Sequence, residues 1–211
     1  WKSWPCEKAA WGGKLEVLKW VREQGWPWHP DICANAAERG HLEGMKWAID
    51  QGCTWRPEDV LNKALKFGDL EMLQYCSAAI PKFERYFTTT SIVTKGAINR
   101  IEISAGTGQL ETIRWFLEKV GFDPDILPPK VCAAAARKGD VKVLKYLRSW
   151  GVPWDETVCL AAADGDHLAV LEWCRRKGAP WNSSLVAHAR SAKLLRWALD
   201  HGVPVEGIEC E

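Results

Sequence analysis

The 211-residue sequence predicts an all-α solenoid of about seven stacked helix-turn-helix repeats. Three observations support this fold class. A Gly-x-Leu-x-x-Leu-x-aromatic motif returns along almost the whole chain. Its apolar residues have the three- and four-residue spacing of one helix face. A second glycine then closes most copies, as expected where a helix ends.

Each repeat is anchored on the first residue of the motif, and 27 positions separate the first two anchors, Gly13 and Gly40. The anchors and their aromatic residues are Gly13 and Trp20, Gly40 and Trp47, Gly68 and Tyr75, Gly108 and Trp115, Gly139 and Tyr146, Asp166 and Trp173; Trp197 marks a shortened seventh copy. This phase predicts one domain, 1–211, with repeats at approximately 4–28, 31–55, 58–77, 97–124, 130–154, 157–181 and 183–205.

The motif itself forms the second helix of each repeat. Closing glycines end it as left-handed C-caps: Gly25, Gly52, Gly121, Gly151, Gly178 and Gly202. A shorter first helix precedes the anchor, and alanine pairs let it approach its neighbours closely: Ala9–Ala10, Ala36–Ala37, Ala135–Ala136 and Ala162–Ala163. A connector, often Pro-Trp, joins the repeats, and Asp155 and Asn182 are placed to cap the helices that follow it.

The pattern breaks between Gly68 and Gly108, which lie 40 positions apart instead of 27. The surplus falls in residues 78–97, where β-branched and turn-forming residues predict a non-helical insertion.

The 14 tryptophans divide by their phase in the repeat. We expect the second-helix aromatics to be core residues: Trp20, Trp47, Trp115, Trp173, Trp197, Tyr75 and Tyr146. The connector aromatics should seal the joints between repeats: Trp28, Trp55, Trp154, Trp181 and Phe83. Trp11, Trp26 and Trp150 fit neither phase and are the candidates for exposed contacts.

Four cysteines, Cys6, Cys33, Cys132 and Cys159, share one phase, and Cys76 and Cys174 share another. Equivalent positions in stacked repeats lie about 8–10 Å apart, beyond the roughly 7 Å between Cα atoms that a disulfide allows. We therefore expect a ladder of small core residues without cross-links, in the cytoplasm or another reducing compartment.

At the anchor, Gly40-His41-Leu42-Glu43 and Gly13-x-Leu15-Glu16-Val17-Leu18 resemble the Gly-His-Leu-Glu-Val-Val run of ankyrin repeats. The resemblance covers about seven units and is closest to short, Trp-rich ankyrin-like arrays of large DNA viruses and algae. It implies a protein-binding solenoid. The Thr-Pro-Leu-His opening is absent and the period is short, so the β-hairpin fingers are expected to be reduced or absent. A leucine-rich repeat also has a suitable period, but Glu23-Gln24-Gly25 stands where its Asn/Cys-x-Leu should follow.

Composition and motifs argue against several functions. A formal net charge of +1 gives no general attraction to nucleic acid or anionic lipid. No apolar run approaches the ~20 residues of a membrane span. No catalytic constellation or Cys-x-x-Cys zinc spacing stands out. We expect no enzyme activity, cofactor or metal, and a monomer. Because Trp1 has the phase of a connector tryptophan, we also expect the array to continue upstream.

The remaining source of function is the surface. In an ankyrin-like array the first helices line the concave face, and positions one, two, five and six before each anchor should project from it. The candidate partner-binding residues are Trp11, Asn35, Arg39, Lys63, Lys66, Phe67, Arg137 and Lys138. We expect a scaffold or adaptor for an unidentified protein. The alternatives are a structural subunit of a larger assembly and an enzyme that uses the 78–97 insertion as a lid.

Overall fold

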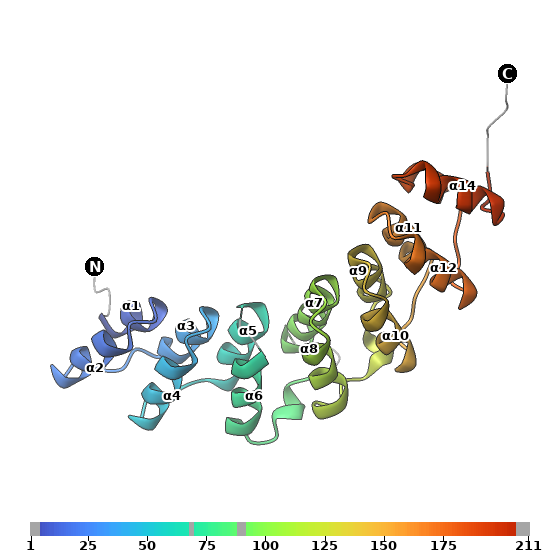
Figure 1. Ribbon diagram of the computed structural model, residues 1–211. Helices are drawn as coiled ribbons and strands as arrows, with labels where there is room; N and C mark the ends of the chain where they lie inside the picture. Colours follow the sequence, from blue (N-terminus) through green and yellow to red (C-terminus); the bar gives the residue numbers. More distant parts are fainter. Residues whose placement is uncertain (1–4, 68–69, 88–91, 206–211) are drawn as a thin grey trace. The chain divides into compact units, whose positions relative to one another are not determined.

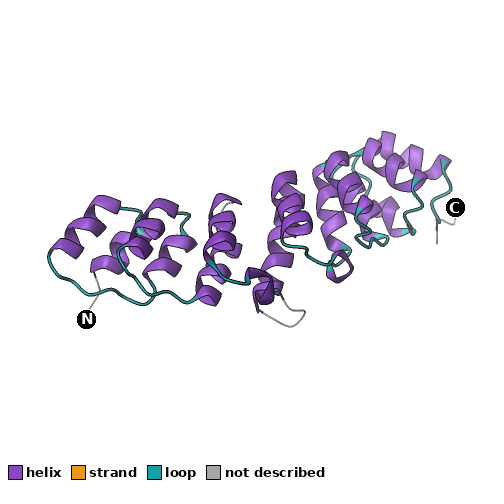
Figure 2. Ribbon diagram, turned by 90° about the horizontal axis from the view of Figure 1, so that it is seen from below, coloured by secondary structure: helices purple, strands orange, loops and turns teal. Residues whose placement is uncertain are grey.

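The computed structural model describes residues 5–67, 70–87 and 92–205 (Figure 1). The chain divides into two compact units, Trp1–Arg100 and Ile101–Glu211. Every regular element in the described ranges is helical, without a strand among them (Figure 2). The predicted fold class is therefore confirmed, whereas the single-domain organisation and the repeat bounds stay predictions.

The described part of the first unit contains three helix pairs. They are α1 (Pro5–Trp11) with α2 (Leu15–Glu23), α3 (Ile32–Glu38) with α4 (Leu42–Asp50), and α5 (Pro57–Phe67) with α6 (Leu70–Ala79). A 3₁₀ turn, η1 (Phe83–Tyr86), and the first part of α7 (Ile92–Thr107) follow. The first helices α1, α3 and α5 pack side by side in a row (Figure 1).

In the second unit, α7 is followed by α8 (Leu110–Arg114), which continues into a π-helical turn, η2 (Trp115–Lys119). After the short turn η3 (Pro124–Ile126), three more pairs follow. They are α9 (Lys130–Lys138) with α10 (Val141–Ser149), α11 (Thr157–Asp164) with α12 (Leu168–Arg176), and α13 (Ser184–His188) with α14 (Ala192–Asp200). Here too the first helices are adjacent: α11 packs between α9 and α13.

Local sequence rules explain where the helices begin and end. The six predicted closing glycines have φ between 68° and 84°, which confirms the left-handed caps. In the sixth repeat Asp166 replaces the anchor glycine and still has a φ of 56°, a conformation that aspartate tolerates better than most residues. The predicted caps Asp155 and Asn182 lie one residue before the N-caps, Glu156 and Ser183, but they still bond the first helical residue: Asp155 Oδ1 accepts the Thr157 N–H at 3.0 Å, and Asn182 Oδ1 accepts the Ser184 N–H at 3.1 Å.

The core between neighbouring repeats consists of small first-helix residues and branched second-helix residues. The four alanine pairs are buried, as are Leu18, Leu73 and Leu144. The phased cysteines are buried too and carry free thiols, which agrees with the predicted ladder: Cys6, Cys33, Cys76, Cys132, Cys159 and Cys174. Small side chains at these positions allow the first helices to pack closely.

The joints between repeats are sealed by what we call the Arg–Trp–Trp stack. Arg22 lies 4.2 Å from the ring of the connector residue Trp28, which meets Trp47 of the next repeat edge-on at 5.9 Å. The same stack returns in the second unit as Arg148–Trp154–Trp173 and Arg175–Trp181–Trp197. The predicted packing across the joints between repeats is thus present for Trp28, Trp154 and Trp181.

Six of the seven second-helix aromatics are not core residues, contrary to our prediction, which is confirmed for Trp115. Trp20 is 58% exposed, and the others are half-buried except Trp115 at 7%. Three of these rings, Trp47, Trp173 and Trp197, pack on connector tryptophans at the rim of the joint, outside the aliphatic core. Trp115 differs because it begins the π-helical turn, with the Val120 N–H bonded to its carbonyl at 3.1 Å, and it packs on Phe116.

The prediction of a non-helical insertion at 78–97 is also wrong for much of its length. Its beginning completes α6, residues Phe83–Tyr86 form η1, and 92–97 belong to α7. Burial of Val93, Thr94 and Ala97 stabilises this helical start and outweighs the weak helix propensity of β-branched residues. Residues 88–91 lie outside the described ranges.

Candidate protein-binding surface

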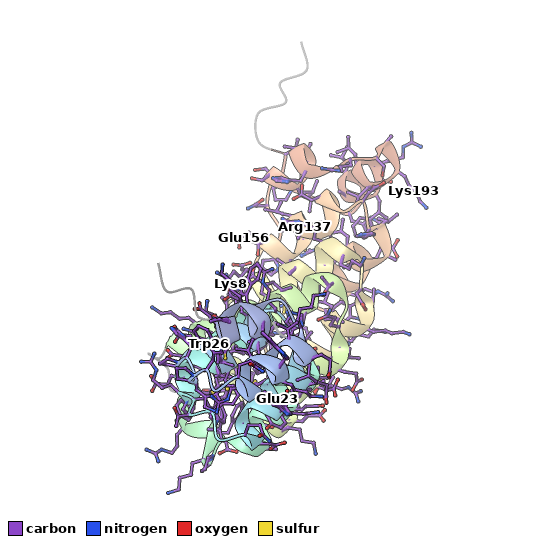
Figure 3. All side chains as sticks on the ribbon, turned by 90° about the vertical axis from the view of Figure 1, so that its left-hand side faces the viewer. Lys8, Glu23, Trp26, Arg137, Glu156 and Lys193 are labelled. Carbon is purple, nitrogen blue, oxygen red and sulfur yellow. The ribbon has the colours of Figure 1, made fainter. Side chains whose placement is uncertain are left out.

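The candidate residues project from the first helices. We define the first-helix surface as the solvent-facing positions of α1, α3 and α5 in the first unit, and of α9 and α11 in the second. Buried residues mark the core side of each of these helices, namely the alanine pairs in α1, α3, α9 and α11, and Leu61, Ala64 and Leu65 in α5. Positions on the opposite side of each helix face outward. Figure 3 labels Lys8 on α1 and Arg137 on α9, both of them exposed.

An aromatic–cation pair stands at one end of this surface in the first unit. Trp11 is 47% exposed, and the Arg39 guanidinium lies over its ring at 3.9 Å. Beside it is an apolar hollow of about 540 Å³ lined by Glu7, Lys8, Trp11 and Gly12. An exposed ring held by a cation and bordered by a hollow is a suitable anchor for a partner side chain.

Polar contacts join the first helices of adjacent repeats. Asn35 Nδ2 donates to Glu7 Oε1 at 3.4 Å, and Lys63 Nζ donates to Glu38 Oε2 at 2.7 Å. A hollow of about 420 Å³ runs between α3 and α5, lined by Asp31, Ala34, Asn35, Arg56, Asp59, Asn62, Lys63 and Lys66. The surface is therefore a groove of alternating charges rather than an apolar cleft.

In the second unit one carboxylate is shared by an arginine and a histidine side chain. Asp164 accepts from Arg137 Nη2 at 3.4 Å and lies 2.6 Å from His188 Nδ1. The hydrogen bond with His188, followed by the positive charges nearby, holds the pKa of Asp164 below its usual value. Lys138 is exposed beside Arg137.

The structure thus brings Trp11 to Arg39 and gathers Asn35, Lys63 and Lys66 around one hollow. Phe67 ends α5, but its side chain lies outside the described part, so that candidate is untested. Whether any candidate contacts a partner stays a prediction.

Three residues that adjoin the first-helix surface were not nominated by the repeat phase: Asp31, Arg56 and His188. Arg56 bonds Asp59 at 2.7 Å from the connector before α5. The repeat phase did not identify His188 because the seventh repeat is shortened, so its residues do not align with the equivalent positions of the other repeats.

Groups of three or more His, Cys, Asp or Glu side chains able to hold a metal ion do not occur in the described ranges. No described helix is both long and apolar enough to cross a membrane.

Comparisons with known proteins agree with the geometry. No family model matches the sequence, and no curated protein does. Among solved structures, the human ASB11 ankyrin repeat domain is similar, with a TM-score of 0.67 and 18% sequence identity over 95% of this chain and 98% of that chain. The chain is therefore an ankyrin-repeat-like protein in its fold, with helix pairs but no described hairpin strand. At this level of identity the similarity establishes the fold alone.

Proposed function

We propose that this protein is a non-enzymatic scaffold or adaptor that binds another protein through the first-helix surface. Ankyrin-like solenoids serve protein interaction in general, because stacked repeats present a long continuous surface. The observation that carries the proposal is the exposed Trp11–Arg39 pair beside an apolar hollow, at the end of a row of charged side chains.

Charge supports a partner with acidic side chains. Three first-helix carboxylates are already bonded to a residue of the adjacent repeat: Glu7 to Asn35, Glu38 to Lys63 and Asp164 to Arg137. Lys8 and Lys138 carry no such bond among the described residues and remain available to a partner. The partner is a protein rather than a nucleic acid, since the chain as a whole has a net charge of only +1. Without its partner, the chain is a monomer.

The test is a triple charge reversal on the surface: Arg39→Glu, Lys66→Glu and Arg137→Glu. Its matched control reverses three exposed cations on or next to second helices, Lys145→Glu, Lys177→Glu and Lys193→Glu, for the same change in net charge. Proteins captured by each variant are quantified by mass spectrometry, and thermal unfolding is measured for both. Loss of one partner from the surface triple alone, at equal stability, supports the proposal. Equal capture by both variants refutes the choice of surface.

Two other functions predicted from the sequence have distinguishable outcomes. A partner that co-purifies in fixed stoichiometry and never exchanges with added free chain indicates a structural subunit. A reaction that depends on residues of the 78–97 segment and survives the surface triple indicates an enzyme.

A further inference from the structure

Two thiols in the second repeat lie in direct contact. Cys33 is in the first turn of α3, and Cys53 follows the glycine that closes α4. Their sulfur atoms are 3.9 Å apart, with the Cys33 thiol as donor to Cys53 Sγ. Both side chains are buried, at 0% and 4% exposure. Cys53 belongs to neither phase of the cysteine ladder, so the argument against cross-links between repeats does not apply to it.

The equivalent positions elsewhere show that this contact is a property of one repeat. The residue 20 positions after the first-helix cysteine is Cys53 in the second repeat, Val152 in the fifth and Ala179 in the sixth. All three place their backbone N–H on a carbonyl of the second helix in the same way: Cys53 on Ala48, Val152 on Leu147 and Ala179 on Cys174. The residue at the position of Cys53 is thus a buried apolar side chain in the fifth and sixth repeats, Trp26 in the first, and a second thiol in the second.

The two thiols are also made unequal by their surroundings. The hydrogen bond from Cys33 lowers the pKa of Cys53, and the positive charge of Arg22 lowers it further against the opposing effect of burial. The same hydrogen bond, together with burial, raises the pKa of Cys33. Four other buried thiols have their pKa raised to about 12 by burial: Cys76, Cys132, Cys159 and Cys174. Cys53 is therefore the more nucleophilic member of the pair.

We propose that Cys33 and Cys53 form a reversible dithiol–disulfide site, oxidised by peroxide. The Cys53 thiolate attacks hydrogen peroxide, the O–O bond breaks, and hydroxide leaves as water after taking up a proton, which produces a sulfenic acid. The Cys33 sulfur then attacks Cys53 Sγ, the S–O bond breaks, and a second water leaves with the Cys33 proton. The two thiols lose two electrons and two protons in total, and a dithiol reductant reverses the change.

The movement needed is small. The sulfur atoms must approach from 3.9 Å to the roughly 2.05 Å of a disulfide. Cys53 lies in a connector between the exposed residues Gly52 and Thr54, and local opening of such a segment admits a small oxidant.

The test is peroxide titration of the folded wild-type chain, followed by alkylation, intact-mass measurement and peptide mapping. We expect two of the eight thiols to disappear first, with the loss of two hydrogen masses and one cross-linked peptide joining Cys33 to Cys53. Dithiothreitol should restore both thiols. Over-oxidation of single cysteines without this cross-link, or a first cross-link between other cysteines, refutes the proposal.

Variants taken from the other repeats sharpen the test. Cys53→Val copies the fifth repeat and should abolish the cross-link, while the control Cys132→Val should leave it unchanged. Val152→Cys places a second thiol at the position equivalent to Cys53, 20 residues after Cys132, and should add a second cross-link. That result would show that the position of the two thiols in the repeat is sufficient for the disulfide to form. If a variant fails to fold, peptide mapping of the oxidised wild-type chain still tests the proposal.

Discussion

Truncation of a connector tryptophan gives the sharpest test of how the repeats hold together. In the Arg–Trp–Trp stack of the second unit, Trp154 is half-buried, 5.9 Å from Trp173 at 70°, with Arg148 4.4 Å from its ring. Trp154→Ala removes both interactions together with the burial of the ring. The edge-on ring pair contributes about 1 kcal/mol beyond burial, and the cation–π contact contributes about 0.5–1 kcal/mol.

The area term is larger. Returning roughly 100 Å² of apolar surface to water costs about 2.5 kcal/mol at 25 cal/mol per Å². Residual compactness of the unfolded chain reduces that figure, so we expect a total loss of about 3 kcal/mol in the free energy of unfolding. Urea unfolding followed by far-UV circular dichroism measures it. Because cooperativity in solenoids can break down between repeats, the midpoint and the slope are both recorded.

Trp26→Ala is the matched control, since Trp26 is 46% exposed and its ring makes no aromatic contact among the described residues. We expect it to cost less than about 0.5 kcal/mol. A double-mutant cycle of Trp154→Ala with Trp173→Ala should give a coupling energy of about 1 kcal/mol. If Trp26→Ala destabilises as much as Trp154→Ala, or if the cycle shows no coupling, the sealing role of the stack is refuted.

Two further predictions concern single residues of the second unit. Gly139→Ala should lower the free energy of unfolding by about 3 kcal/mol and Gly151→Ala by only about 1 kcal/mol, as measured by urea unfolding. Both glycines have a positive φ, but a Cβ at Gly139 would lie 2.7 Å from His167, whereas a Cβ at Gly151 would have no atom within 4 Å. Equal costs would exclude the His167 contact as the cause. Asp164→Asn should lower stability at neutral pH by at most about 1 kcal/mol. Because the bond to His188 lowers the pKa of Asp164, that difference should vanish as the pH falls below 3.8 and the wild-type carboxylate becomes protonated; a difference that persists in acid contradicts the argument.

The helix pairs could be predicted because their causes are local or periodic. Leu144 is buried since it lies on the apolar stripe of α10, and Gly151 ends that helix since it accepts a left-handed conformation. Even Asp166, which breaks the glycine pattern, keeps the anchor geometry because its phase in the repeat imposes it.

The burial of single aromatic rings could not be predicted in the same way. Trp20 and Trp115 share one motif position, yet one is 58% exposed and the other 7%. The motif determines which side of the second helix carries the ring, but the next element decides what covers it. No described connector tryptophan packs on Trp20, whereas Trp115 is enclosed by the π-helical turn and Phe116.

The candidate surface lies between these cases. Repeat phase correctly placed Asn35, Lys63 and Arg137 on the first helices, but each of them is bonded to a carboxylate one repeat away. These carboxylate partners are brought close by the stacking of the repeats, so they cannot be recognised by comparing the residues at one repeat position. A charge reversal on this surface therefore disturbs a neighbouring repeat as well as a partner. For this reason, binding measurements on Arg137 variants have physical meaning only beside their unfolding curves. Lys8 and Lys138, which have no carboxylate partner among the described residues, are the cleaner probes of recognition.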